Sequence, residues 1–192
     1  PGIVFRDALP VWDENIVLCM SLSKIGLPAV RTGIVVAREE IIEGLAGVTA
    51  VTSLAPPSAG PALMLDLVRG GRLLQVCREV VTPHYHARMR QALAWVHEEF
   101  AGCDYYVHRP EGAIFLWLWF PGLPITSLEL YRRLKARGVL VLPGSYFFPG
   151  MNEPWPHRDE CLRITYAQDP LVVREGIRLI AEEVRRSRDS GG

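Results

Sequence analysis

The stretch from Ser21 to Gly33 (SLSKIGLPAVRTG) places one lysine among hydroxyls, a glycine, a proline and an arginine. A short apolar run, residues 16–20, precedes it and another, residues 33–37, follows it, which is typical of two strands joined by a loop. We therefore expect Lys24 to lie in that loop, exposed for chemistry. Hydroxyl donors and a guanidinium suit a phosphate dianion, because charge-assisted hydrogen bonds are short and strong. The stretch is a candidate phosphate site around an amine.

The pattern Ser-x-Ser-Lys, then Gly-Leu-Pro, then Arg-x-Gly resembles the cofactor-lysine signature of the class I and II aminotransferases, which are pyridoxal phosphate (PLP) enzymes of fold type I. The resemblance covers nearly the whole chain, continuing through residues 53–56 (SLAP), 110–119 (PEGAIFLWLW), 137–144 (RGVLVLPG) and 162–166 (LRITY). The segments 116–120 and 147–157 look like the valine–pyruvate branch of the family. The interval of seven residues between Lys24 and Arg31 is also similar to that branch.

The resemblance implies an α/β fold, the C-terminal part of a fold type I PLP-dependent transferase, and it implies roles for five side chains. Lys24 would bond covalently with the cofactor aldehyde and move the proton at the substrate α-carbon. Ser21, Ser23 and Arg31 would bind the cofactor phosphate together with that lysine. Arg163, in the Arg-Ile-Thr-Tyr position, would bind the substrate carboxylate. Without the resemblance, the ordinary interpretation would be that Lys24 is a surface lysine, that Ser21 and Ser23 cap a loop, and that Arg163 is a solvated residue on a strand.

The activity implied is that of an aminotransferase. It would exchange an amino group between a small aliphatic amino acid, such as valine or alanine, and a 2-oxo acid, such as pyruvate, in a homodimer. Three alternatives stay open: another fold type I PLP enzyme, the PLP-dependent ligand-sensing domain of a transcription regulator, and a catalytically dead structural subunit. The last is disfavoured because Lys24 and Arg163 are both present.

The likeness begins in the middle of the family's sequence, and the chain opens with Pro1, so we expect a C-terminal portion of the enzyme. By resemblance, the aspartate that faces the pyridine nitrogen, the ring-stacking aromatic residue and the asparagine partner all lie upstream. We therefore expect the 192 residues by themselves to lack turnover.

The charge balance and the cysteines indicate which partners and which cell compartment to expect. Lysine plus arginine and aspartate plus glutamate both number 21, which gives no electrostatic reason to expect nucleic acid or an acidic membrane surface as a partner. Four cysteines without a CxxC pair, and no signal-peptide pattern, predict a cytoplasmic protein. His84 and His86 are two residues apart and do not share a helix face, so we expect no metal site there.

Periodicity predicts three segments: residues 1–74 as the remnant of the large PLP-binding domain, 75–102 as a long bridging helix kinked at Pro83, and 103–192 as a small α+β domain. Strands are expected at 104–108, 113–120, 139–142 and 161–166. Helices are expected from residue 38, at 62–69, at 127–137 with Thr126 or Ser127 as the cap, and at the end of the chain, where Val173, Ile177, Ile180 and Val184 recur. The alternating Phe115, Trp117 and Trp119 are assigned to core packing, and Arg163 and Thr165 to the face opposite Leu162, Ile164 and Tyr166.

Overall fold

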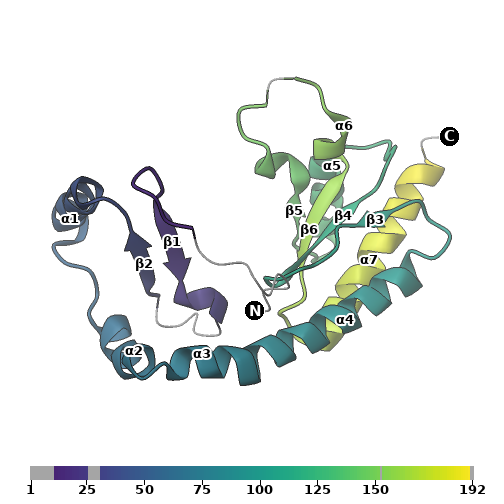
Figure 1. Ribbon diagram of the computed structural model, residues 1–192. Coiled ribbons are helices and arrows are strands. Elements are labelled where there is room, and N and C mark those ends of the chain that lie inside the picture. Colours follow the sequence, from purple (N-terminus) through teal and green to yellow (C-terminus); the bar gives the residue numbers. More distant parts are fainter. Residues whose placement is uncertain (1–10, 26–30, 152, 191–192) are drawn as a thin grey trace. The chain divides into compact units, whose positions relative to one another are not determined.

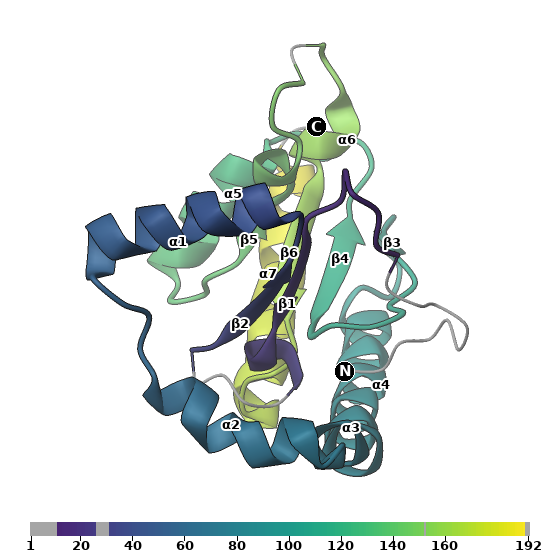
Figure 2. The same ribbon diagram turned by 60° about the vertical axis from the view of Figure 1, so that its left-hand side comes forward.

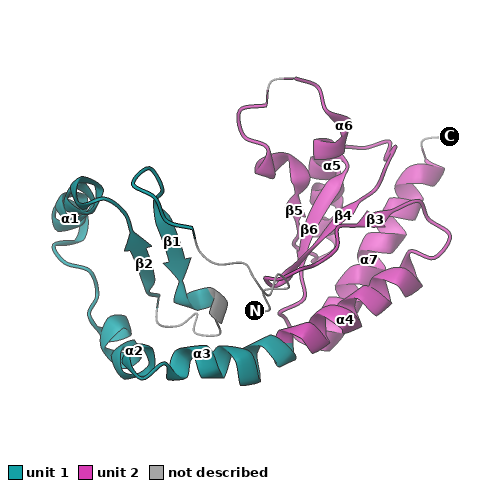
Figure 3. Cartoon of the chain, in the orientation of Figure 1, with its two compact units in different colours: residues 1–84 teal, residues 85–192 magenta. Residues whose placement is uncertain are grey.

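The computed structural model of the chain describes residues 11–25, 31–151 and 153–190, and for Lys24 and Ile25 it describes the backbone alone. The chain divides into two compact units, residues 1–84 and residues 85–192 (Figure 3). The division lies inside the helical run that the sequence analysis assigned to a bridging helix. The boundaries at residues 74 and 102 stay a prediction.

Unit 1 contains an antiparallel pair of short strands, β1 (Leu18–Ser21) and β2 (Gly33–Val36), which match the two predicted apolar runs (Figure 1). The register pairs Ser21 with Gly33, and the N–H of Leu22 donates to the carbonyl of Thr32 at 3.1 Å, which extends the pairing by one residue. A 3-10 turn, η1 (Leu22–Ile25), follows β1 directly. Lys24 therefore lies in the connection after a strand, as expected, and there its backbone forms part of a 3-10 turn.

The helices of unit 1 bury few side chains. They are α1 (Glu39–Ser53), α2 (Ala59–Arg69), α3 (Arg72–Val76) and the π-helical turn η3 (Cys77–Val81). No residue of α1 is buried, and its Val48 and Val51 are 61% and 88% exposed. In α2 only Gly60 and Met64 are buried. Unit 1 thus leaves much of its apolar surface uncovered within the described chain, and apolar patches of that kind mark interaction surfaces.

A nearly continuous helical run leads from α3 through η3 into α4 (Thr82–Glu99). Pro83 has no N–H, and its ring crowds the carbonyl of Glu79, four residues earlier. The run accommodates this with a π turn just before the proline, in which the N–H of Thr82 donates to the carbonyl of Cys77, five residues back. The irregularity expected at Pro83 is therefore a widened turn that precedes it.

Unit 2 is a four-stranded antiparallel sheet with helices on one face (Figures 1 and 2). The strand order is β3 (Tyr106–Val107), β4 (Phe115–Trp119), β6 (Cys161–Thr165) and β5 (Leu142–Pro143). The remaining elements are α5 (Ser127–Ala136), η4 (Gly144–Phe147), α6 (Pro156–Asp159) and α7 (Pro170–Asp189). Three of the predicted strands are present, with β3 shorter than expected, whereas β5 begins only at Leu142, the last residue of the strand predicted at 139–142.

The core of unit 2 lies between one face of this sheet and helices α4, α5 and α7. Leu116 and Leu118 of β4 and Leu162 and Ile164 of β6 point into it, as does Tyr166 just beyond. The helices contribute apolar residues at helical spacing: Ala92, Val96, Leu130, Leu134, Val173, Ile177, Ile180, Ala181 and Val184. The stripe predicted for the last helix is therefore confirmed.

The other face of the sheet carries Phe115, Trp117 and Trp119, which are only partly buried. Their assignment to the core was wrong, because strict alternation along β4 sends the leucines to the helices and the aromatic residues to the opposite side. Arg163 and Thr165 lie on this second face, as their alternation with Leu162 and Ile164 predicted. The sheet thus separates an apolar core from an aromatic surface.

Local capping fixes the helix that precedes β5. The hydroxyl of Thr126 accepts the N–H of Glu129 at 3.2 Å, so Thr126, and not Ser127, is the N-cap of α5. Gly138 closes the helix with a φ of 81°, a left-handed conformation that favours glycine. The buried carboxylate of Glu183 on α7 lies 3.4 Å from the Arg137 guanidinium and ties the end of α5 to α7.

Candidate active site

The pairing of β1 with β2 brings three of the predicted site residues together. Because Ser21 is opposite Gly33, Ser23 lies two residues beyond the end of one strand and Arg31 two residues before the start of the other. The Arg31 guanidinium donates to the Ser23 hydroxyl at 3.4 Å, and the Ser23 N–H donates to the Ser21 hydroxyl oxygen at 3.3 Å. Arg31 has a φ of 45°, a left-handed conformation that is uncommon for a residue with a side chain. Sheet register and a strained backbone therefore hold Arg31 beside the serines.

This cluster has unused hydrogen-bonding capacity. Ser21 and Ser23 use their hydroxyl oxygens as acceptors, and within the described residues neither hydroxyl proton has an acceptor. Arg31 forms no ion pair with a carboxylate of the described chain. Two hydroxyl donors and an unneutralised guanidinium match an oxygen-rich anion such as a phosphate.

Lys24 lies between Ser23 and Arg31 in the chain. Its backbone belongs to η1, one residue after Ser23, while its side chain and residues 26–30 lie outside the described part of the structure. The short turn anchors at Leu22, whose side chain is 4% exposed. The backbone of the lysine is thus fixed next to the two hydroxyls.

Arg163 occupies the aromatic face of unit 2. It lies on β6 between two paired neighbours, Trp117 on β4 and Leu142 on β5. The guanidinium carbon lies over the ring of Phe115, 4.2 Å from its centroid, and over the ring of Phe147, 4.6 Å from its centroid. The Nε atom of Arg163 is fully buried and has no hydrogen-bond partner in the described chain. Phe115 and Phe147 were not among the predicted site residues. The register of β4 with β6 brings Phe115 to Arg163, and the packing of η4 brings Phe147 there, and neither can be predicted from local sequence.

A chain of ring contacts fixes the segment that carries Phe147. Phe147 meets Trp117 edge-on at 5.3 Å, and Phe148 meets Trp155 edge-on at 5.0 Å. Trp155 stacks on His157 at 4.8 Å. At the base, Gly144 lies so close to β6 that an added Cβ would come within 2.7 Å of the Arg158 carbonyl oxygen and of the Cys161 Cβ. The start of η4 is therefore packed onto the strand that holds Arg163, and the ring contacts link Phe147 and Phe148 to Trp117, Trp155 and His157.

Glu160 and Cys161, at the start of β6, make further contacts with β4 and α6. The Glu160 carboxylate accepts the indole N–H of Trp119 at 2.8 Å and the N–H of Gly122 at 3.0 Å. The Cys161 sulfur lies 3.5 Å from Nε2 of His157. Burial raises the pKa of the Cys161 thiol to about 11, so this sulfur stays protonated and serves as packing.

We expect Cys161 to resist alkylation in the folded protein. A rise of its pKa from 9.0 to about 11 lowers the thiolate fraction at pH 8 about 100-fold, and burial blocks access as well. Iodoacetamide treatment followed by peptide mass spectrometry measures the rate, and the protein unfolded in urea is the control in which Cys161 should react freely. Equal rates in the folded and unfolded protein would contradict the described packing.

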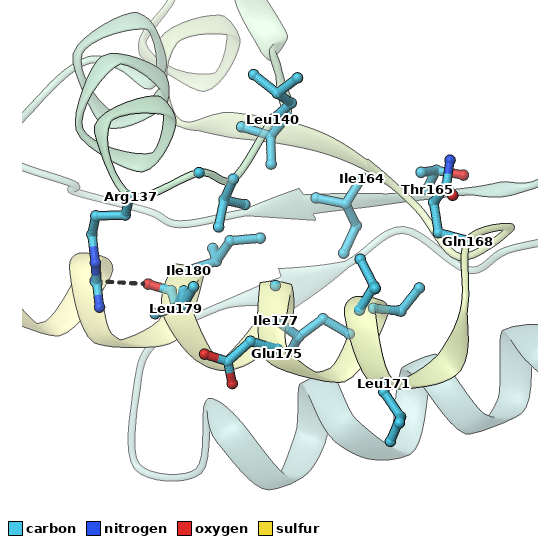
Figure 4. Close-up of a pocket in the computed structure, with 16 residues that line it drawn as sticks. Arg137, Leu140, Ile164, Thr165, Gln168, Leu171, Glu175, Ile177, Leu179 and Ile180 are labelled. Carbon is cyan, nitrogen blue, oxygen red and sulfur yellow. Dashed lines mark hydrogen bonds between the residues drawn. The ribbon is translucent and has the colours of Figure 1, made fainter.

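The structure also contains an apolar cavity of about 620 Å³ on the helix side of β6 (Figure 4). Leu140, Ile164, Leu171 and Ile177 are among its lining residues, and Arg137 at its edge donates to the carbonyl of Leu179 at 3.4 Å. Its polar lining residues are Arg137, Thr165, Gln168 and Glu175, and none of the predicted site residues contributes to it. The cluster around Arg31 in unit 1 and the aromatic face around Arg163 in unit 2 are therefore separate from this cavity.

Three further observations concern the described residues only. They contain no group of three or more histidine, cysteine, aspartate or glutamate side chains arranged to hold a metal ion. Their four cysteines form no disulfide. None of their helices combines the length and the apolar character that crossing a bilayer requires.

Residues 8–180 match the family described as aminotransferase class I and II. The chain is 46% identical over 187 residues to the valine–pyruvate aminotransferase of Escherichia coli (strain K12), which covers 97% of this chain and 45% of that protein. It therefore spans less than half the length of this relative.

Solved structures give the same result. The crystal structure of valine–pyruvate aminotransferase from Salmonella typhimurium LT2 matches with a TM-score of 0.89 and 46% identity, over 99% of this chain and 49% of that one. A putative amino-acid aminotransferase from Psychrobacter arcticum 273-4 matches with a TM-score of 0.90 and 43% identity, over 97% of this chain and 43% of that one. The predicted fold type is confirmed by these matches. The chain belongs to the class I and II aminotransferase family, with the fold of the fold type I PLP-dependent transferases.

Proposed function

We propose that the complete protein is a PLP-dependent aminotransferase that exchanges an amino group between a small aliphatic amino acid, such as valine or alanine, and a 2-oxo acid, such as pyruvate. The observation that carries this proposal is the gathering of Ser21, Ser23 and Arg31 beside the backbone of Lys24. The 46% identity to a valine–pyruvate aminotransferase supports the choice of substrates.

The residues present fit PLP as the cofactor. Ser21 and Ser23 would donate to phosphate oxygens, and Arg31 would add a charged donor that no described carboxylate neutralises. Lys24 would hold the cofactor covalently through its amine. When bound, PLP withdraws electrons from the amino acid α-carbon and so makes its proton removable. The chain's own residues then determine where that proton goes and how the substrate is oriented.

Lys24 is assigned the proton transfer. Once the substrate amino group has displaced it from the cofactor, its free amine would take the proton from the α-carbon of the amino acid and would return one to the same atom when the oxo acid is converted in the reverse half. Arg163 binds the α-carboxylate, which amino acid and oxo acid share, so one guanidinium serves both half-reactions. This division gives Arg31 to the cofactor and Arg163 to the substrate.

The proposal includes a homodimeric assembly and a cytoplasmic location. The uncovered apolar surface of unit 1 supports a homodimer, because such surface is usually covered by further protein. The absence of disulfides among the four cysteines supports the cytoplasm, where thiols stay reduced.

The direct test uses the purified complete protein with PLP, nitrogen-15 valine and pyruvate. We expect nitrogen-15 alanine to form in step with 2-oxo-3-methylbutanoate, both measured by mass spectrometry. Aspartate is the matched comparison, since its second carboxylate has no assigned partner, and we expect slower transfer from it. A protein that binds PLP but forms no labelled alanine would contradict the proposed activity.

A further inference from the structure

We propose that Phe115 and Phe147 are positioning residues for Arg163: their rings fix the guanidinium so that its edge is presented as a two-pronged donor to the substrate carboxylate. This inference rests on the proposed function and names how the substrate site is built. None of the predicted roles includes either phenylalanine.

The first step is geometric. Phe115 precedes Trp117 by two residues on β4, and Trp117 is paired with Arg163, so Phe115 is the diagonal neighbour of Arg163 on the same sheet face. Its ring centroid lies 4.2 Å from the guanidinium carbon. Phe147 reaches the same guanidinium from η4, with its centroid 4.6 Å away. Two elements far apart in the chain thus place a ring face against one cation.

The second step concerns what the rings leave unused. A ring face attracts a cation through its quadrupole but accepts no strong hydrogen bond, so the N–H groups of Arg163 stay available. Within the described chain the Arg163 guanidinium has no ion pair and no hydrogen bond, and its Nε is fully buried. The two terminal nitrogens are not among the buried polar atoms, so a carboxylate can reach them and accept from both as a bidentate pair.

The third step concerns the stiffness of the arrangement. Phe147 is held edge-on against Trp117 at 5.3 Å, and Trp117 is itself the strand partner of Arg163. Close contact between Gly144 and Cys161 fixes the start of η4. The guanidinium is therefore oriented by neighbours that are anchored to its own sheet, and less freedom remains to be lost when a carboxylate binds.

The test compares three single variants of the complete protein: Phe147→Leu, which removes the ring, Phe147→Tyr, which keeps it, and Tyr146→Leu, the matched control. Tyr146 is the preceding residue on η4, is 63% exposed, and is not one of the two rings that lie over Arg163. Phe147 is 38% exposed, so its truncation should not prevent folding. Phe115→Leu provides a second, independent removal of a ring.

Isovalerate is the probe, because it carries the carboxylate and side chain of valine but no amino group and cannot react. We expect Phe147→Leu to weaken isovalerate binding by calorimetry about 10-fold, the size of one desolvated cation–ring contact, with PLP affinity unchanged. The KM for valine should rise by a similar factor while kcat changes little, and Phe147→Tyr should restore both. Isovaleramide, which lacks the charge, should bind all variants alike.

Two contrary results have different meanings. If the unsubstituted protein bound no isovalerate, the assignment of Arg163 to substrate, and with it the proposed function, would fail. If it bound isovalerate and both Phe147→Leu and Phe115→Leu bound it equally well, the proposed function would stand and the positioning role of the rings would be wrong.

Discussion

Replacing Lys24 by alanine is expected to abolish both covalent attachment of PLP and amino transfer. The amine is assigned two tasks, bonding to the cofactor and moving the α-proton, and no other group in the cluster with Ser21, Ser23 and Arg31 can do either. Loss of a positioned acid–base group alone typically lowers a rate by about 10²- to 10⁴-fold, and loss of the covalent link adds to this. Turnover should therefore fall to the background of the assay.

The second lysine of this sequence, Lys135, provides a control for this experiment. The sequence has only two lysines, Lys24 and Lys135, and the second lies on α5, with its amine 6.0 Å from the ring of Tyr131. Borohydride reduction in the presence of PLP, followed by peptide mass spectrometry, should place the cofactor mass on the Lys24 peptide. Lys135→Ala should keep both the adduct and the activity. An adduct on Lys135 in the unsubstituted protein would reject the assignment of Lys24.

The second large effect is expected from Arg163→Leu, which should weaken substrate binding while covalent PLP attachment remains. The guanidinium is assigned to the α-carboxylate, and truncating one partner of a buried, hydrogen-bonded charge pair costs about 2 to 5 kcal/mol. The binding of the amino acid and that of the oxo acid should weaken by a similar factor, since both carry that carboxylate. Arg163→Lys should rescue only part of the loss, because an ammonium keeps the charge but not the planar fork.

Arg31→Leu is the matched comparison for that variant. It should weaken PLP itself, because Arg31 lies with Ser23 in the proposed phosphate cluster. Separate titrations of cofactor and of isovalerate distinguish the two arginines. The roles assigned to them would be reversed if Arg163→Leu lowered PLP affinity and Arg31→Leu affected only the carboxylate.

The sequence predicted the cluster in unit 1 largely by resemblance, and the structure supplies the reason for it. Two short apolar runs around residues 21–33 indicated strands, but periodicity alone says nothing about their direction or register. The antiparallel pairing of Ser21 with Gly33 is what places Arg31 beside Ser23. The left-handed backbone of Arg31 had no signal in the sequence, because that conformation is rare for arginine.

In unit 2 the local elements were predictable and the order of the strands was not. Alternation along β6 correctly placed Arg163 on the face opposite Leu162. Helix α5 begins after the Thr126 cap and ends at Gly138, as ordinary capping chemistry predicts. The sheet order, in which β4 and β6 are neighbours, is a long-range result. It sets Trp117 against Arg163, on the sheet face opposite the core on which Phe115 and Trp119 also lie.

The π turn before Pro83 has a consequence for how helical patterns are read along this chain. A turn closed over five residues, with the N–H of Thr82 on the carbonyl of Cys77, holds one residue more than a regular α-turn. In a regular helix each residue advances the side-chain direction by about 100°. The π turn thus acts as a one-residue insertion, which shifts the side-chain directions of α4 by about that angle against a regular continuation of α3. Deleting one residue from 77–81 would remove this shift and rotate the apolar positions of α4 away from the residues they now pack against.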